Sequence, residues 1–226
     1  MGWLKRHSTD DDHEAPETSE DATVGPPLRS AGPWDTTERQ TADDPSYVDL
    51  GALQIRGRAG MEIRLQSDGD TDRIGAALVL ADESALELRV FAAPRSSGQW
   101  DLVRADIVEE VVRMEGDQTE IVGPFGPELH IQIPVTTEDG QAGFQPSRII
   151  GVEGPRWMLR ATLLGRSAIS PSNDDPLIDV LRDVVVVRGE QAMMAREALL
   201  LTPPATAVVP EADSDADAEQ DATDAE

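Results

Sequence analysis

The chain has 226 residues and a formal net charge of −25, with 44 acidic residues against 19 lysines and arginines and no cysteine. The lack of cysteine excludes disulfides, thiol catalysis and thiolate metal sites. The negative charge disfavours nucleic-acid binding, because phosphate groups are repelled by an acidic surface without a dense basic patch.

Charge and composition divide the chain into three parts. Residues 1–45 are rich in Asp, Glu, Thr, Ser and Pro with almost no periodic apolar pattern, and residues 203–226 carry eight acids and no base. Such segments bury too little apolar surface to offset the entropy of ordering a chain. We therefore predict disordered acidic tails at 1–45 and 203–226 around a single α+β domain at 46–202.

The sequence gives no sign of secretion or membrane insertion. The N-terminus has no apolar stretch of secretory length, and Arg6 stands where a myristoylation signal has serine or threonine. No apolar run approaches the roughly 18 residues that a membrane span needs. We expect a cytoplasmic protein with no membrane association.

The first half of the domain shows the alternation of β-strands. Met61, Ile63 and Leu65 alternate with polar residues, whereas residues 74–80 are apolar on both faces, which is typical of a central strand. A further strand is predicted over 86–90. The turns between these strands have hairpin length and predict antiparallel pairing.

An amphipathic helix follows. Its apolar stripe consists of Trp100, Val103, Ile107, Val111 and Met114. Gly116 ends the pattern. At the other end, Ser96 and Gln99 have the spacing of a capping box, in which the glutamine side chain reaches back to the serine amide.

The second half repeats the plan of strands followed by a helix. Alternation predicts strands over 129–135 and 157–163, with a return strand over 144–152 between them that is broken or bulged near Pro146. Asp139-Gly140 is a strong hairpin turn signal between the first two.

The last elements of the domain complete the fold class. Asp175-Pro176 predicts the N-cap and first position of a short helix, and the β-branched run 184–187 predicts a closing strand. The fold class is therefore α+β, with a largely antiparallel sheet of about six to eight strands and two main amphipathic helices. The order of elements resembles the PsbP-like sandwich, which is used mainly for binding.

Four segments of the domain are distinctive in sequence. They are FAAPRSSGQWDLVRADI at 91–107, GPFGPEL at 123–129, GVEGPRWMLRATLLGRSA at 151–168 and PLIDVLRDVVVVRG at 176–189. Together they resemble an actinobacterial family of proteins with a domain of unknown function, number 3710, over about residues 46–202. The resemblance implies a cytoplasmic bacterial protein and no assigned activity, so no catalytic residue is carried over from it.

Acidic residues near a turn have part of a calcium-binding pattern. Asp68, Asp70 and Asp72 have the spacing of a calcium loop, but Arg73 and Val79 stand where that loop has glycine and glutamate. A hairpin turn is the better interpretation.

Catalytic patterns are equally weak. His130 is the single histidine of the predicted domain, and its place on the polar side of a strand predicts a lone solvated side chain. No serine lies in a nucleophile elbow, and the glycine-containing turns lack the lysine of a phosphate loop. We predict no catalytic residue, no metal site and no cofactor, which favours a protein without enzymatic activity.

Three arginines are the candidate ligand-binding residues. Arg95 precedes the predicted helix at 100–114, whose N-terminal amides favour anions. If Arg148 and Arg156 converge there, the three form a pocket for a carboxylate or phosphate. The alternative is that each pairs with a nearby acid of the same domain.

Three functions follow as hypotheses. The lack of a catalytic pair, a metal cluster and a nucleotide loop, together with two charged tails, favours a non-enzymatic protein-interaction or adaptor module with an unidentified protein partner. The first alternative is a small anionic-ligand-binding protein, or an unrecognised enzyme, that uses the arginines near Arg95. The second is a nucleic-acid-associated protein. The sequence leaves the oligomeric state open.

Overall fold

The computed structural model describes residues 31–69, 73–137 and 139–204. Its elements in chain order are β1 (Trp34–Asp35), β2 (Tyr47–Asp49), β3 (Leu53–Arg56), β4 (Met61–Ser67), β5 (Ile74–Ala81), β6 (Ser84–Ala92), α1 (Gln99–Arg113), β7 (Asp117–Gly123), β8 (Gly126–Thr136), β9 (Ala142–Gly154), β10 (Trp157–Gly165), α2 (Arg166–Ile169), α3 (Pro176–Asp183) and β11 (Val185–Val186). Within these residues no helix is both long enough and apolar enough to cross a membrane.

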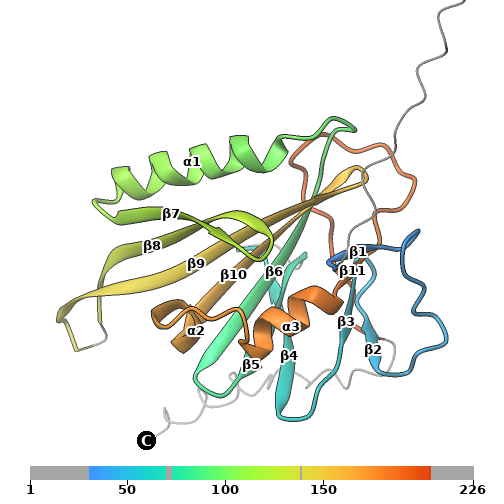
Figure 1. Ribbon diagram of the computed structural model, residues 1–226, viewed down its shortest axis with the longest axis horizontal. Helices are drawn as coiled ribbons and strands as arrows, with labels where there is room; N and C mark the ends of the chain where they lie inside the picture. The colour runs from blue at the N-terminus through green and yellow to red at the C-terminus, as the bar shows by residue number, and fades with distance from the viewer. Residues whose placement is uncertain (1–30, 70–72, 138, 205–226) are drawn as a thin grey trace, which may run out of the picture.

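The described residues form two β-sheets (Figure 1). The larger has seven strands in the order β4-β5-β6-β10-β9-β8-β7, with antiparallel neighbours throughout. The smaller has four strands in the order β1-β11-β3-β2, with β1 parallel to β11 and the other neighbours antiparallel. The expected α+β class with a sheet of six to eight strands is confirmed, and the smaller sheet is an addition to it.

Two apolar cores lie on opposite faces of the larger sheet. The main core joins residues of β5, β6 and β10 to β3, β11 and α3, and includes the fully buried Trp157. The second lies under α1 and consists of Trp100, Val111, Leu129, Ile131, Ile149 and Met158. In Figure 1, α1 covers one face and α3 lies on the other with the smaller sheet. The two predicted amphipathic helices therefore cover the two faces, as helices on a sheet are expected to do.

Residues 31–45, which composition assigned to the N-terminal tail, belong to the packed structure. The Trp34 amide donates to the Val184 carbonyl at 2.8 Å, and the Trp157 indole donates to the Asp35 carboxylate at 2.7 Å. A buried indole N–H needs an acceptor, and Asp35 supplies it. Of the predicted tails at 1–45 and 203–226, residues 1–30 and 205–226 lie outside the described residues.

Pro146 does not interrupt β9, contrary to the expected break. It pairs with Gln132 of β8, and the pairing of β9 with β10 ends at Arg148. Beyond that point β9 has no partner strand on its β10 side, which is the edge position at which a strand tolerates proline. β9 is therefore continuous over all its residues.

Candidate functional site

The N-terminus of α1 differs from the predicted capping box. Its N-cap is Gly98, with φ 98°, and no side chain of the cap residue bonds to the helix, so the proposed role of Ser96 is wrong. The Glu153 carboxylate of β9 takes that place, because Oε2 accepts from the Gly98 amide at 3.0 Å and Oε1 accepts from the Trp100 amide. A carboxylate at this end of a helix satisfies free amides and interacts favourably with the helix dipole.

The three arginines proposed as ligand-binding residues do not converge at this helix. Glu153 occupies the position that an anionic ligand would take. Arg95 is exposed and makes no ion pair within the described part of the chain. Arg156 donates to the Gln191 carbonyl at 3.4 Å, and Arg148 is buried elsewhere. The structure therefore removes Arg148 from the group of candidates that the sequence proposed.

Arg148 forms a closed ion pair inside the protein. Its Nε and Nη2 donate to the two carboxylate oxygens of Glu128 at 2.8 and 3.1 Å, and Nη1 donates to the Ser172 carbonyl at 3.3 Å. Both side chains are buried, at 2% and 0% exposure. His130 is not the lone solvated histidine that the sequence suggested, because its Nε2 lies 2.8 Å from Glu128 Oε1. The bidentate geometry of Arg148 with Glu128 is that of a structural ion pair.

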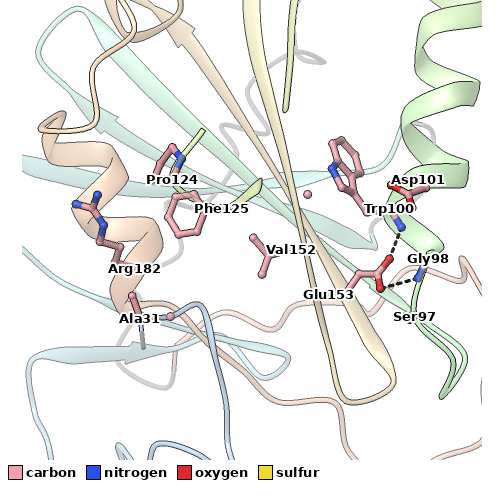
Figure 2. Close-up of a pocket in the computed structure, with 12 residues that line it drawn as sticks. Ala31, Ser97, Gly98, Trp100, Asp101, Pro124, Phe125, Val152, Glu153 and Arg182 are labelled. Atoms are coloured by element: carbon pink, nitrogen blue, oxygen red, sulfur yellow. Dashed lines mark hydrogen bonds between the residues drawn. The ribbon is translucent and has the colours of Figure 1, made fainter. Parts of the chain in front are cut away.

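A cavity of about 820 Å³ lies beside the N-terminus of α1 (Figure 2). One wall is formed by Ser97 to Asp101, and its opposite wall by Phe125 of the β7–β8 turn and Arg182 of α3. Val152 lies between these walls, and Ala31 lies below Arg182 in the view. The cavity thus joins elements from both faces of the sheet.

Trp100 is held rigidly in the cavity wall. Its indole lies directly against the backbone of Gly151, where an added Cβ would come 2.1 Å from Trp100 Cδ2. The indole Nε1 donates to the Pro127 carbonyl at 2.7 Å. Glycine is therefore required at position 151, and the aromatic wall is fixed by contacts on both sides.

The charged side chains of this cavity already have partners in the chain. Asp101 pairs with Arg104 at 3.0 Å, and Arg182 pairs with Asp179 at 2.6 Å and donates to the Asn173 carbonyl. The residues that line the cavity include no histidine, cysteine or lysine. Across the described residues, no group of three or more His, Asp or Glu side chains could hold a metal ion. The arrangement can bind, but it presents no nucleophile paired with a base.

Sequence reasoning did not find Phe125 and Glu153 as site residues. Both lie in or near glycine-containing hairpins. The turn signals of these hairpins account for the local sequence, so they gave no indication of contacts with distant segments. No spacing pattern links Glu153 to the Gly98 amide, because the contact depends on how α1 lies over β9.

Comparison with known proteins assigns the chain to a family. No curated protein matches the chain. Residues 32–209 match the family described as "Protein of unknown function (DUF3710)", which is more than half of the chain and agrees with the resemblance of its four distinctive segments. The chain therefore belongs to the DUF3710 family.

Proposed function

We propose that this protein is a non-enzymatic, cytoplasmic protein-interaction module, and that the cavity beside α1 receives a segment of its partner. The observation that carries this proposal is the cavity lining. Trp100, Phe125 and Val152 supply apolar groups to a lining that is otherwise largely polar, and its charged side chains are committed to partners within the chain. A concave site that combines an aromatic wall with polar groups is a usual place of binding.

The charge of the molecule indicates the kind of partner. The chain carries a net charge of −25, and the Asp101 side chain at the cavity rim is 71% exposed. Complementary charge speeds association and selects partners. The proposed ligand is therefore an extended segment with an apolar side chain for the wall of Trp100 and Phe125, flanked by basic residues.

Site-specific photo-crosslinking in the full chain tests this proposal. A photoreactive residue at position 97, which is exposed and lines the cavity, is expected to give a protein adduct in cells. The matched position is Glu109, which is exposed on α1 and outside the cavity lining. Equal adducts from both positions, or none from position 97, would contradict the proposal.

Affinity measurements with the captured partner provide the second step. Asp101→Arg is expected to weaken binding about tenfold, which corresponds to about 1.4 kcal/mol. Glu109→Arg makes the same charge change on the same helix and is expected to leave affinity unchanged. If both variants weaken binding equally, only the overall charge matters and the cavity is not the docking site.

A further inference from the structure

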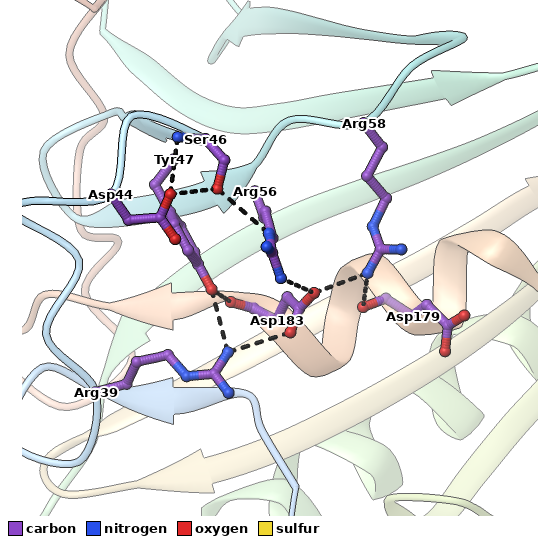
Figure 3. Close-up of polar contacts among 8 residues, drawn as sticks. All are labelled: Arg39, Asp44, Ser46, Tyr47, Arg56, Arg58, Asp179 and Asp183. Atoms are coloured by element: carbon purple, nitrogen blue, oxygen red, sulfur yellow. Dashed lines mark hydrogen bonds and ion pairs between the residues drawn. The ribbon is translucent and has the colours of Figure 1, made fainter.

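A second polar cluster lies at the C-terminal end of α3, where Asp183 follows the cavity residue Arg182 (Figure 3). Three arginines converge there on one carboxylate, that of Asp183. The N–O distances are 3.1 Å from Arg39, 3.7 Å from Arg56 and 2.7 Å from Arg58. In a strongly acidic chain this is a local excess of positive charge.

Two of these arginines have a structural role. Arg58 Nη2 donates to the Asp179 carbonyl at 3.2 Å, and the Tyr47 hydroxyl donates to the Asp183 carbonyl at 3.1 Å, so both satisfy acceptors in the last turn of α3. Arg39 donates to the Tyr47 hydroxyl. Burial opposes its charge, but the hydrogen bonds to Tyr47 and Asp183 raise the pKa of Arg39 above its usual value. These contacts attach residues 39–58 to the helix.

Arg56 is the surplus member of the cluster. It is exposed, its ion pair is the longest of the three, and its hydrogen bond goes from Nε to the Ser46 hydroxyl at 3.3 Å. Within the described residues its two terminal nitrogens donate no hydrogen bond. Arg58 donates through Nη2, and its Nη1 donates no hydrogen bond within those residues. Both arginines therefore have donors available for another acceptor.

The nearby acids do not cancel this excess. Asp44 accepts from the Ser46 hydroxyl and amide, and these bonds, helped by the charge of Arg56, hold the pKa of Asp44 below its usual value. The Asp179 carboxylate pairs with Arg182. Counting Asp44 and Asp183, the cluster still has three guanidinium groups for two carboxylates.

An apolar cavity adjoins the two arginines with free donors. It has a volume of about 300 Å³ and is lined by Arg56, Gly57, Arg58, Val48, Met61, Ile63 and Val79. Val79 is buried in the main core, and the other three apolar residues pack against that core while remaining partly exposed. The cavity therefore has a cationic rim and an apolar floor.

We propose that this site binds an organic carboxylate, with its head group on Arg56 and Arg58 and its apolar part in the cavity of Val48, Met61 and Ile63. Guanidinium groups suit a carboxylate because they can donate two parallel hydrogen bonds. This cluster already holds the carboxylate of Asp183, whose two oxygens accept one bond from Arg39 and one from Arg58. The site is separate from the proposed protein-docking cavity and does not depend on it. Either a free fatty-acid-like molecule or the C-terminal carboxylate of a peptide carries this chemistry.

Calorimetric titration of the full chain tests the proposal with defined probes. Octanoate represents the fatty-acid-like source, N-acetylleucine represents a peptide C-terminus, and acetate supplies the head group alone. Saturable binding of octanoate or N-acetylleucine supports the proposal, and the tighter of the two identifies the source. Acetate is expected to bind at least about tenfold more weakly, because it leaves the apolar floor unfilled.

Variants separate the site from general charge effects. Arg56→Gln is expected to lower the affinity about tenfold or more, since a charge-assisted hydrogen bond is lost. Arg64→Gln is the matched control, because Arg64 is exposed on β4, pairs with Glu62 and does not line the cavity. Thermal unfolding of both variants checks that each is folded. Absence of saturable binding by both larger probes, or equal affinity in the wild type and Arg56→Gln, would overturn the proposal.

Discussion

Arg148 and Arg58 each donate to a carboxylate, but their surroundings are opposite. Arg148 lies with Glu128 between buried residues of β8 and β9, and each oxygen of that carboxylate accepts a bond from it. Arg58 shares Asp183 with two further arginines, and all three guanidinium side chains are at least 34% exposed. The first cluster is closed and balanced, whereas the second is open and carries excess positive charge.

The difference shows which arginines are available to a ligand. In a buried ion pair, leaving either charge unpaired costs several kcal/mol, so the arginine does not leave its carboxylate to bind a ligand. A half-exposed cluster loses little free energy when one of its arginines changes its partner, because water solvates the exposed charges. Removing a charge from the closed cluster is therefore expected to lower stability more than removing one from the open cluster, although the N–O distances in the two clusters are similar.

The largest effect is expected for Arg148→Met. This change leaves the Glu128 carboxylate at 0% exposure with His130 as its remaining side-chain partner. Breaking a buried pair in this way costs about 3–5 kcal/mol, which urea unfolding measures. Adding Glu128→Leu to the same variant is expected to recover much of the loss, since no unpaired charge remains. A loss below about 1 kcal/mol for Arg148→Met would show that the pair is solvated and not closed.

A smaller effect is expected for Asp183→Ala in the open cluster. The change removes bonds to Arg39 and Arg58 but exposes those guanidinium groups to water. Hydrogen bonds to charged groups contribute about 1.5–3 kcal/mol each, yet a carboxylate at a helix C-terminus is opposed by the helix dipole. We expect a net loss of about 2 kcal/mol, measured by the same unfolding assay. A loss equal to that of Arg148→Met would remove the distinction between the clusters.

A still smaller effect is expected for Glu153, whose carboxylate caps α1 in a partly buried position. Glu153→Gln keeps the shape but removes the charge at the helix N-terminus, with an expected loss of about 1 kcal/mol. Hydrogen exchange should accelerate at the Gly98 and Trp100 amides and remain unchanged in β5. Glu109→Gln, which changes an exposed residue of the same helix, serves as the control. Unchanged exchange at both amides would show that water replaces the cap.

The periodic spacing of apolar residues predicted the strands and helices that bury one or both of their faces. The strands β4, β5, β6, β8, β9 and β10 and the helices α1 and α3 all follow apolar patterns visible in the sequence. By contrast, β7 was missed because its residues are almost all exposed, so no alternation of burial shaped them. Of the smaller sheet only β11 was predicted, from the run 184–187. The strands β1, β2 and β3 were missed because they are only two to four residues long.

The site could not be predicted to the same extent, because its contacts join distant segments. Sequence could place Arg148 on the strand 144–152, but not beside Glu128, since that contact depends on the register of β8 with β9, in which Arg148 lies opposite His130. Arg56 and Arg58 are two residues apart, which is a local signal of paired cations. Their carboxylate partner Asp183 lies on α3, and only the packing of that helix against β3 brings them together.

The smallest stability effect is expected for Arg56→Gln. Arg56 has the longest ion pair of the open cluster and 47% of its side chain is exposed, so solvent screens its interaction with Asp183. Exposed ion pairs contribute about 0–1 kcal/mol, and we expect a change near the lower end in urea unfolding. Raising the salt concentration should shrink even this difference, because exposed charges are screened over about 10 Å at 0.1 M salt. A salt-independent loss above about 2 kcal/mol would mean that Arg56 is needed for the fold. In that case the free donors assigned to ligand binding would belong to the structural contacts of α3.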